Sequence, residues 1–447
     1  MPSTEARVAG DQLDRSIGPW ALGANAVNLT VAAGIFALPA VVAAILGPAA
    51  VLAYLICALL IVLVLGCFAE VGSHVTTSGG AIAYVEEAFG PFAGFLTWAV
   101  ASVGFSVAAD AAIANLMVDS LASMIPAVKG GVARIIILVA TFGVLAAVNV
   151  RGVRQGTRLS VATTVAKLLP LVLIVLLGVF VIEWRNLAWA GWPSRSQLGV
   201  AALVLFFAFC GAEGALMPSG EIRDPARTVP RGMLGAAAAI ALLYIALQLT
   251  AQGVLGSDLL AHADAPLVDV ADRIAGAAGR GVVLACIVVA IFGALAADMI
   301  GVPRGFLAVA ESGMLPRSLA ALHPEFRTPW ISILAFAALT LLASISGAFR
   351  PLAVLSSMAL LLVYLGVCLA ALKLRYTRPR APGAFRMPGG PLPALLASAT
   401  VVWLLAHSTL REAIAMASFI ALAILYYVIR RGFRRDVRTE PAVVTKV

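Results

Sequence analysis

The sequence predicts an all-α integral membrane protein. Hydrophobic residues make up 62% of its 447 residues and charged residues only 12%, whereas a soluble domain has about 25% charged residues. The mean hydropathy is +1.02. A helix needs about 20 consecutive apolar residues to cross a bilayer, and the chain contains roughly a dozen such stretches. A soluble globular domain is therefore excluded.

The apolar stretches divide into twelve predicted transmembrane helices separated by polar segments. A polar, mixed-charge segment precedes the first of them, and we expect no cleavable signal there. The predicted spans are 20–46, 48–72, 91–122, 132–149, 159–182, 197–219, 233–255, 277–301, 329–347, 351–373, 391–408 and 411–429.

The distribution of positive charge predicts the orientation. An even number of spans places both termini on one side of the membrane. If that side is the cytoplasm, 22 of the 31 Lys and Arg residues lie there and eight lie opposite, with Lys167 inside a span. Because Lys and Arg favour the cytoplasmic side, we expect a multi-pass protein of the inner (plasma) membrane with both termini cytoplasmic. The net charge of +9 then follows from topology and lipid contact, and it does not indicate nucleic-acid binding.

The sixth predicted span carries residues that break helices. Gly211, Gly214 and Pro218 follow a run of hydrocarbon side chains, together with Glu213. A charged residue at mid-membrane costs about 2.5–3.5 kcal/mol to insert. Unpaired backbone groups cost several kcal/mol each in lipid, so a broken helix persists only where it lines a cavity or a ligand. Secondary transporters use such half-helix ends to bind a small zwitterion or ion.

The first span is predicted to be broken as well. The segment TVAAGIFALPA (30–40) has small residues at Ala32, Ala33 and Gly34, followed by Pro39. A break in each half is typical of transporters built from two related repeats. The predicted organisation is a cytoplasmic N-terminal tail, two five-span repeats, two additional spans and a basic cytoplasmic tail. Their ranges are 1–19, 20–182, 197–373, 391–429 and 430–447.

Four motifs in order resemble the amino acid–polyamine–organocation transporter superfamily. They are AAGIFALP in the first span, FAEVGSHVTTSGGAIAYVEEAFGP (68–91), FFAFCGAEGALMPSGEIRDPARTVPRG (206–232) and RGFLAVAESGMLP (304–316). The resemblance covers nearly the whole chain. It implies a leucine-transporter-like 5+5 inverted repeat with helices 1 and 6 broken, and alternating-access transport of amino acids or amines.

The resemblance also implies a substrate site at the two breaks. Backbone N–H groups of Ala33, Gly34 and Ile35 would bind the substrate carboxylate, and many members have a serine where Ala33 stands. Carbonyl groups around four residues would meet the substrate ammonium: Thr30, Phe207, Cys210 and Gly211. Phe207 matches an aromatic gate, and cysteine at position 210 replaces a family glycine, which would narrow the pocket.

Lys167, in VATTVAKLLPLVLIVLL, is the single basic residue deep in a predicted span. A snorkelling or ion-paired lysine is the ordinary interpretation. It lies about 13 Å along the helix from Arg158, which is far for snorkelling. By resemblance it occupies the place of a sodium ion and braces the first break, which would make transport sodium-independent.

Three acidic residues lie inside predicted spans: Asp110, Glu213 and Asp298. Intramembrane carboxyl groups indicate function, although one of them could pair with Lys167. Resemblance to arginine–agmatine antiporters places all three at the side-chain end of the substrate pocket. Two explanations stay open: the acids bind a cationic substrate, or some are protonated and carry a coupling proton. Lys167 and Glu213 are the candidate coupling residues.

Two cytoplasmic features are also predicted. The segment AIAYVEEAF is expected to form a short interfacial helix with Glu86 and Glu87 facing water. An ion-pair cluster is expected after the sixth span, from Glu221, Arg223, Asp224, Arg227 and Arg231.

The predicted function is secondary active transport of an amino acid, with a cationic amino acid or polyamine preferred and proton coupling or exchange as the energy source. A neutral amino acid permease of the same fold is the alternative. An ion channel would need a filter-like stretch, and a membrane enzyme would need a cluster of catalytic groups; neither pattern is evident. The five cysteines and four histidines are scattered, so neither a metal site nor a cofactor is expected.

Overall fold

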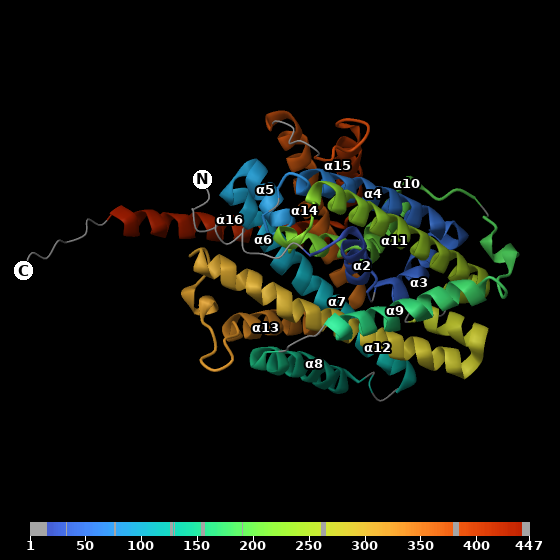
Figure 1. The fold of residues 1–447 in the computed structure, drawn as a ribbon. Helices are drawn as coiled ribbons and strands as arrows, with labels where there is room; N and C mark the ends of the chain where they lie inside the picture. The colour runs from blue at the N-terminus through green and yellow to red at the C-terminus, as the bar shows by residue number, and fades with distance from the viewer. Residues whose placement is uncertain are drawn as a thin grey trace, which may run out of the picture.

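The computed structural model describes residues 16–439, except 33, 76, 126–127, 129, 153–156, 190, 261–264 and 379–383. The side chains of residues 123–124, 157–165 and 432–439 also lie outside the description. Within the described ranges the chain is helical, and its one β-type contact is a parallel bridge between Ile17 and Ile222 (Figure 1).

The first five predicted spans fall on helices α2 to α9. These elements are α2 (Pro19–Thr30), α3 (Gly34–Leu46), η1 (Gly47–Ala50), α4 (Val51–Gly72), α5 (Ala81–Phe89), α6 (Pro91–Ala99), the π-helical η2 (Val100–Phe105), α7 (Ser106–Met124), α8 (Gly131–Arg151) and α9 (Thr157–Gly178). The short helix α5 has the bounds that the sequence predicts.

The remaining spans fall on α10 to α16. The elements are η4 (Trp184–Leu187), α10 (Arg195–Leu205), η5 (Phe206–Phe209), η6 (Ala212–Leu216), η7 (Ser219–Glu221), α11 (Pro225–Leu255), η8 (Gly256–Leu260), α12 (Pro266–Glu311), η9 (Arg317–Ala320), α13 (Trp330–Ser346), α14 (Phe349–Thr377), α15 (Leu392–Leu405) and α16 (Leu410–Thr439). A capping box formed by Ser194 and Gln197 starts α10, as expected for a Ser-x-x-Gln sequence.

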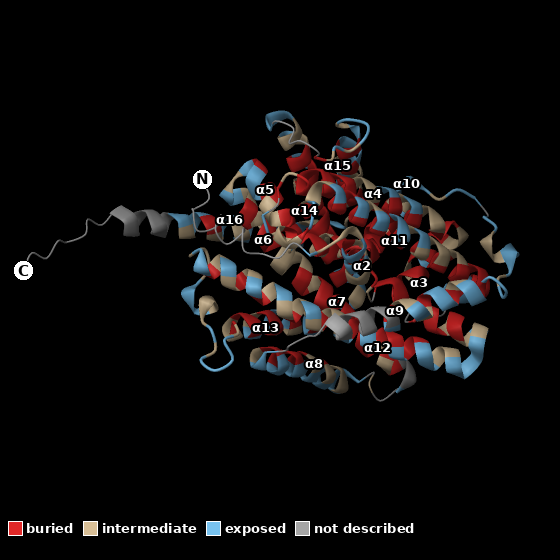
Figure 2. Cartoon of the chain, in the orientation of Figure 1, coloured by how far each residue is buried: buried red, intermediate tan, exposed pale blue. Residues whose placement is uncertain are grey.

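Length and composition support a multi-pass membrane protein. Eight helical stretches of the described chain are long and apolar enough to cross a bilayer, and three shorter apolar helices accompany them. Large apolar side chains are exposed along α8 and α16, including Ile136 and Leu425, and pale blue marks these helices in Figure 2. A lipid-facing surface has this character. The count of twelve spans stays a prediction.

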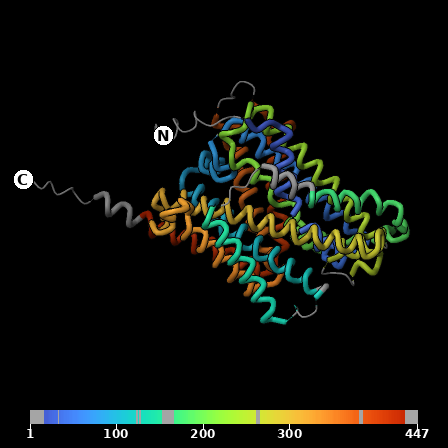
Figure 3. The backbone as a smooth tube through the Cα atoms, turned by 60° about the horizontal axis from the view of Figure 1, so that its bottom comes forward, coloured from blue at the N-terminus to red at the C-terminus, as the bar shows by residue number. Residues whose placement is uncertain are grey.

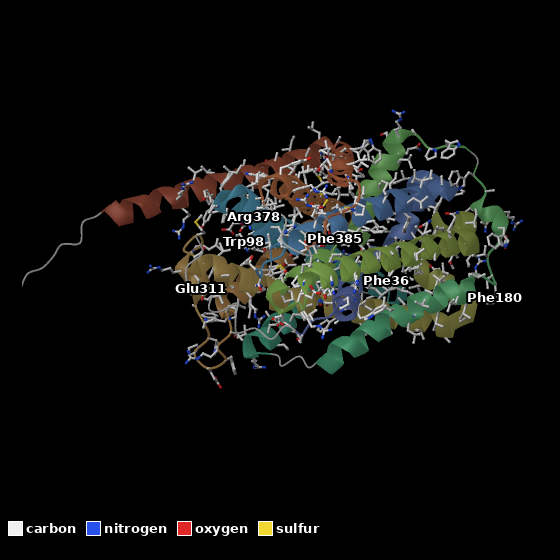
Figure 4. All side chains as sticks on the ribbon, turned by 45° about the horizontal axis from the view of Figure 1, so that its top comes forward. Phe36, Trp98, Phe180, Glu311, Arg378 and Phe385 are labelled. Carbon is white, nitrogen blue, oxygen red and sulfur yellow. The ribbon has the colours of Figure 1, made fainter. Side chains whose placement is uncertain are left out.

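The connections alternate between two ends of the molecule. Phe180, after α9, lies at one end in Figure 4, whereas Glu311 and Arg378, at the ends of α12 and α14, lie at the other. The turns η4 and η8 contact each other, and the tube in Figure 3 shows green and yellow segments together at the first end. These ends match the two sides of the membrane that the sequence predicts. Which of them faces the cytoplasm stays a prediction from charge.

The helices pack into two groups that meet along the middle of the molecule. Helices α2 and α4 both pack on α11, and η6 packs on α2. We call these four elements the first group. Helices α7, α8, α12 and α13 pack on one another and form the second group, which lies below the first in Figure 1. Helix α14 contacts both α4 and α7, so it bridges the groups.

The first break lies at the predicted small residues before Gly34, but Pro39 does not extend it, and the second break begins earlier than predicted. In the first span the helix ends at Thr30 and resumes at Gly34, but Pro39 lies inside α3. Proline removes the hydrogen bond to the carbonyl of Ile35, four residues earlier, and its ring crowds that carbonyl, yet the helix continues to Leu46. In the sixth span α10 already ends at Leu205, and 3-10 turns follow to Glu221.

The predicted loop between the seventh and eighth spans is also partly helical. Turn η8 follows α11, and α12 begins at Pro266. The backbone of α12 is non-helical at Ala275 and Gly276. A short helix therefore precedes the eighth span at this kink.

Candidate functional site

The two breaks lie against each other. A Cβ atom added at Gly211 would lie 2.7 Å from the carbonyl oxygen of Leu29, and Gly211 has φ +117°. A Cβ atom added at Gly34 would lie 2.9 Å from Cδ1 of Phe207 and 3.2 Å from Cα of Ala208. Only glycine allows such close approach of the two backbones. The glycines at the two breaks thus allow the broken segments to approach each other closely.

The break in the first span exposes backbone groups at two helix ends. Helix α3 begins at Gly34, and the first N–H groups of any α-helix have no partner within the helix. The N–H groups of Gly34 and Ile35 are therefore suited to bind a carboxylate. Ala33, the third predicted donor, lies outside the described residues.

The carbonyl of Thr30 is occupied in this conformation. It accepts hydrogen bonds from the Tyr244 hydroxyl at 3.0 Å and from the Ala32 N–H at 2.8 Å. Tyr244 is buried in α11, so it fixes the end of α2 against that helix. Contact between the Thr30 carbonyl and a substrate ammonium stays a prediction.

Phe207 and Cys210 are buried at the second break. The ring of Phe207 packs edge-on against Phe349 of α14, with 5.9 Å between ring centroids. The same ring contacts the backbone at Gly34, where α3 begins. The thiol of Cys210 donates to the carbonyl of Phe206 at 3.3 Å. Phe207 thus lies between the first break and α14, and its role as an aromatic gate stays a prediction.

Lys167 lies at the end of α2 and not beside an acid. Its side chain is 8% exposed, and its ammonium donates to the carbonyl of Asn28. Among the described residues, no carboxylate forms an ion pair with it. The last carbonyls of a helix are unpaired and carry partial negative charge, which a cation stabilises. The alternative of a lysine paired with an intramembrane acid is therefore wrong for this conformation.

The three intramembrane acids come together from different elements. Asp110 of α7 and Asp298 of α12 lie near each other, on two helices that pack together. Asp298 also lies close enough to Glu213 of η6 to interact electrostatically. Glu213 accepts hydrogen bonds from the Tyr364 hydroxyl at 2.5 Å and from the Gly211 N–H at 3.1 Å. The acids therefore line the meeting point of the two groups.

Sequence reasoning missed Tyr244, Tyr364 and Arg375. Tyr244 and Tyr364 contact Thr30 and Glu213, which the sequence analysis names, and Arg375 contacts Glu70, which lies in the second motif. Arg375 forms a buried bidentate pair with Glu70, at 2.7 and 2.9 Å, and Glu70 also accepts from the Met387 N–H at 3.0 Å. The sequence did hold a signal for these residues, because tyrosine and arginine side chains in apolar surroundings carry hydrogen-bond donors that need partners. Which residue is the partner of each could not be read from the sequence.

The cytoplasmic predictions have mixed outcomes. Glu86 and Glu87 are exposed on α5, as predicted, and Glu87 pairs with Arg378 of α14. In the segment after η7, the structure shows one ion pair of the expected cluster, between Asp224 and Arg227 at 3.7 Å. The Ile17 N–H instead donates to the carbonyl of Glu221 at 3.1 Å. This backbone contact joins the N-terminal segment to the end of the sixth span.

The site has the chemistry of a binding site for a small charged solute. It combines unpaired N–H groups at a helix start, a covering aromatic ring and carboxyl groups at one side. The described residues contain no group of three or more His, Cys, Asp or Glu side chains able to hold a metal ion.

Several known transporters are similar to this chain in sequence. The chain is 27% identical over 397 residues to the serine/threonine exchanger of Bacillus subtilis (strain 168), covering 86% of this chain and 89% of that protein. It is 24% identical over 415 residues to the branched-chain amino acid permease of the same organism, covering 87% of each. It is also 31% identical over 364 residues to an uncharacterised transporter of Mycobacterium tuberculosis (strain ATCC 25618 / H37Rv), covering 79% of each.

The model of the amino acid permease family matches residues 17–429. This match includes both helix breaks, Lys167 and the three intramembrane acids. The protein is therefore a membrane transporter and not an enzyme, and it belongs to the amino acid permease family.

Proposed function

We propose that the protein moves a cationic amino acid, or a related amine, across the cell membrane by alternating access. The observation that carries this proposal is the contact between two interrupted helices, at Gly211 and Leu29 and at Gly34 and Phe207. Midplane sites at such breaks are where secondary transporters bind their substrates. The substrate carboxylate would meet the N–H groups at the start of α3, and its ammonium would meet the carbonyls near Thr30, Cys210 and Gly211.

The acids support a cationic substrate. Asp110, Glu213 and Asp298 converge without a basic partner among the described residues. A cationic side chain would supply the missing positive charge, because an opposite charge within about 4–6 Å stabilises a carboxylate. We assign Glu213 the direct contact, since two donors hold its carboxylate in place.

A neutral amino acid is the second candidate. Its support comes from relatives whose names state serine, threonine or branched-chain substrates. At identities of 27% and 24%, the residues that surround the substrate side chain can differ between this protein and those relatives. In this case the acids would be protonated and would not contact the substrate.

Lys167 supports sodium-independent transport. Its ammonium occupies the carbonyl end of α2, where a sodium ion would otherwise balance the helix dipole. The driving force would then be a proton gradient or exchange of one substrate for another. The cytoplasmic position of both termini belongs to the same proposal, and the charge distribution of the loops supports it.

Binding and counterflow measurements test the proposal. Purified protein is screened by thermal shift against amino acids and amines, at two pH values, with and without sodium. Proteoliposomes loaded with unlabelled arginine should then accumulate labelled arginine with saturation. Glu213→Gln should weaken the binding of arginine more than the binding of serine. Equal losses of affinity for the two substrates would favour the neutral alternative. Absence of any saturable flux would overturn the transporter proposal.

A further inference from the structure

A small cavity lies between α8, α12 and α13, away from the two helix breaks. These three helices pack on one another and lie in the lower part of Figure 1. The cavity has a volume of about 50 Å³, several times the roughly 10–15 Å³ that one water molecule requires, so a group with several oxygen atoms fits. Its polar lining comes from Asn149 at the end of α8, Arg304 of α12 and Thr328 before α13. Among the described residues no lining residue comes from the interrupted helices, so the cavity is distinct from the proposed substrate site.

The lining presents hydrogen-bond donors. The exposed side chain of Arg304 carries five N–H donors, and one of them bonds to the carbonyl of Ile300. Asn149 is 7% exposed, and its amide nitrogen donates to the carbonyl of Leu145 at 2.8 Å, which leaves its second hydrogen for another acceptor. Helix α13 begins at Trp330 and adds the N–H groups and the positive partial charge of a helix start. These donors favour an anion.

The nearest backbone acceptors already have partners. The hydroxyl of Thr328 donates to the carbonyl of Val150 at 2.6 Å, and the N–H of Gly152 donates to the carbonyl of Asn149 at 3.1 Å. Both carbonyls belong to the last turn of α8, where a helix carries partial negative charge. Because they are hydrogen-bonded, they repel an anion less than bare carbonyls would.

Two further arginines flank the cavity. Arg151 precedes Gly152, which lines the cavity, and Arg327 precedes Thr328; both arginines are exposed. Among the described residues, no carboxylate forms an ion pair with Arg151, Arg304 or Arg327. An anion from outside the described chain would therefore balance this positive charge.

The cavity adjoins the surface that faces lipid. Val148 of α8 is 44% exposed and Leu334 of α13 is 45% exposed, and each is next in sequence to a residue that lines the cavity. Arg304 lies about 10 Å along the helix from Glu311, which marks one end of the molecule in Figure 4. Basic pockets between transmembrane helices, at the level where spans end, are suited to anionic lipid headgroups.

We propose that this cavity binds the phosphate headgroup of an anionic phospholipid, with Arg304 as its main contact. The planar guanidinium of arginine can donate two parallel hydrogen bonds to phosphate oxygens. Asn149 and the N–H groups at the start of α13 meet the remaining oxygens, and the acyl chains lie along the exposed side chains of α8 and α13. The lipid then joins three helices of the second group. This inference does not depend on which substrate is transported.

Native mass spectrometry of the purified full-length protein in detergent tests the site. Phosphatidylglycerol is titrated into the sample, and phosphatidylcholine, whose phosphate is balanced by a choline cation, is the lipid control. Phosphatidylglycerol should bind with saturation and raise the unfolding temperature, and phosphatidylcholine should bind more weakly. Inorganic phosphate, the soluble source of the same group, should not displace the lipid at equal concentration. Full displacement by phosphate would overturn the assignment to a lipid.

Three variants assign the contact to the cavity. Arg304→Gln should weaken the binding of phosphatidylglycerol about fivefold, the factor expected for one arginine at an anionic headgroup. Arg304→Lys keeps the charge but loses the paired donors, so its affinity should lie between those of Arg304→Gln and wild type. Arg317→Gln is the matched control, because this exposed arginine begins η9, between α12 and α13, and does not line the cavity. It removes the same charge and should bind the lipid as wild type does.

The outcomes are separate from those for amino acid transport. Equal binding of phosphatidylglycerol and phosphatidylcholine by the wild type overturns the inference without any variant. Equal losses in Arg304→Gln and Arg317→Gln would mean that the general surface charge attracts the lipid, and this result overturns it too. Neither result affects the proposed function, which the counterflow measurements test independently.

Discussion

Gly211→Ala tests the central geometric claim, that the two breaks are pressed together. The perturbation adds one methyl group at a residue with φ +117°. The added Cβ would lie 2.7 Å from the carbonyl oxygen of Leu29, 3.0 Å from its carbonyl carbon and 3.3 Å from the amide nitrogen of Thr30. All three atoms belong to the backbone, so no side-chain rotation relieves the overlap.

Two costs set the expected magnitude. A left-handed conformation costs a non-glycine residue about 1–3 kcal/mol. Insertion of a methyl group into a well-packed contact costs a further 1–3 kcal/mol, roughly. We therefore expect Gly211→Ala to lose about 2–6 kcal/mol, a large fraction of the roughly 5–15 kcal/mol that stabilises a folded protein.

Thermal unfolding in detergent, followed by the loss of the monodisperse peak, measures the effect. Gly235→Ala in α11 is the matched control, because a Cβ there meets nothing within 4 Å and alanine gains about 0.5–1 kcal/mol over glycine inside a helix. Gly211→Ala should unfold at a clearly lower temperature and lose uptake, whereas Gly235→Ala should match or exceed wild type. Equal unfolding temperatures for the two variants would refute the claim that the breaks touch.

Three further predictions follow from single contacts. Lys167→Ala should abolish uptake while the protein still reaches the membrane, because the carbonyl end of α2 loses its cation; normal uptake in whole cells would contradict its assigned role. Replacing sodium by choline should leave uptake by the wild type unchanged, and a sodium requirement would show that the lysine does not stand in for the ion. Arg375→Met should cost about 3–5 kcal/mol in unfolding experiments, since it leaves Glu70 as an unpaired buried charge. The half-exposed pair of Arg378 with Glu87 gives the control, and Arg378→Met should cost less than about 1 kcal/mol.

The helical membrane class and the break in the first span could be predicted because local sequence determines them. Uninterrupted apolar runs require helices in a bilayer, and the small residues before Gly34 weaken the helix at one point. The short helix α5 has the predicted bounds because glycines flank it, with Gly80 at φ +53° and Gly90 at φ +89°. In these places the residues adjacent in the sequence are enough to determine the local structure.

The second break and the acid site could not be predicted fully because they depend on distant contacts. Helix α10 ends before Gly211 and Gly214, where Phe206 packs edge-on against Tyr364 and Phe209 packs against Tyr244. Asp110 and Asp298 are far apart in the chain but lie near each other in the fold. Sequence spacing indicated that intramembrane acids have a function, but it could not show which two acids are neighbours.

The division into two groups gives a final prediction about motion. Rocking should change the contacts that cross between the groups, such as the packing of α11 on α12, and should keep contacts within a group, such as Arg134 with Asp119. Spin labels at Gly143 in α8 and Gly235 in α11 meet open space in this structure, and pulsed dipolar spectroscopy can measure their separation in a background lacking the five native cysteines. Added arginine should change this distance, whereas the distance from Gly143 to Gly293 in α12, another open position, should stay constant. If both distances respond equally, the second group does not move as a unit, and the substrate site does not lie between rigid bodies.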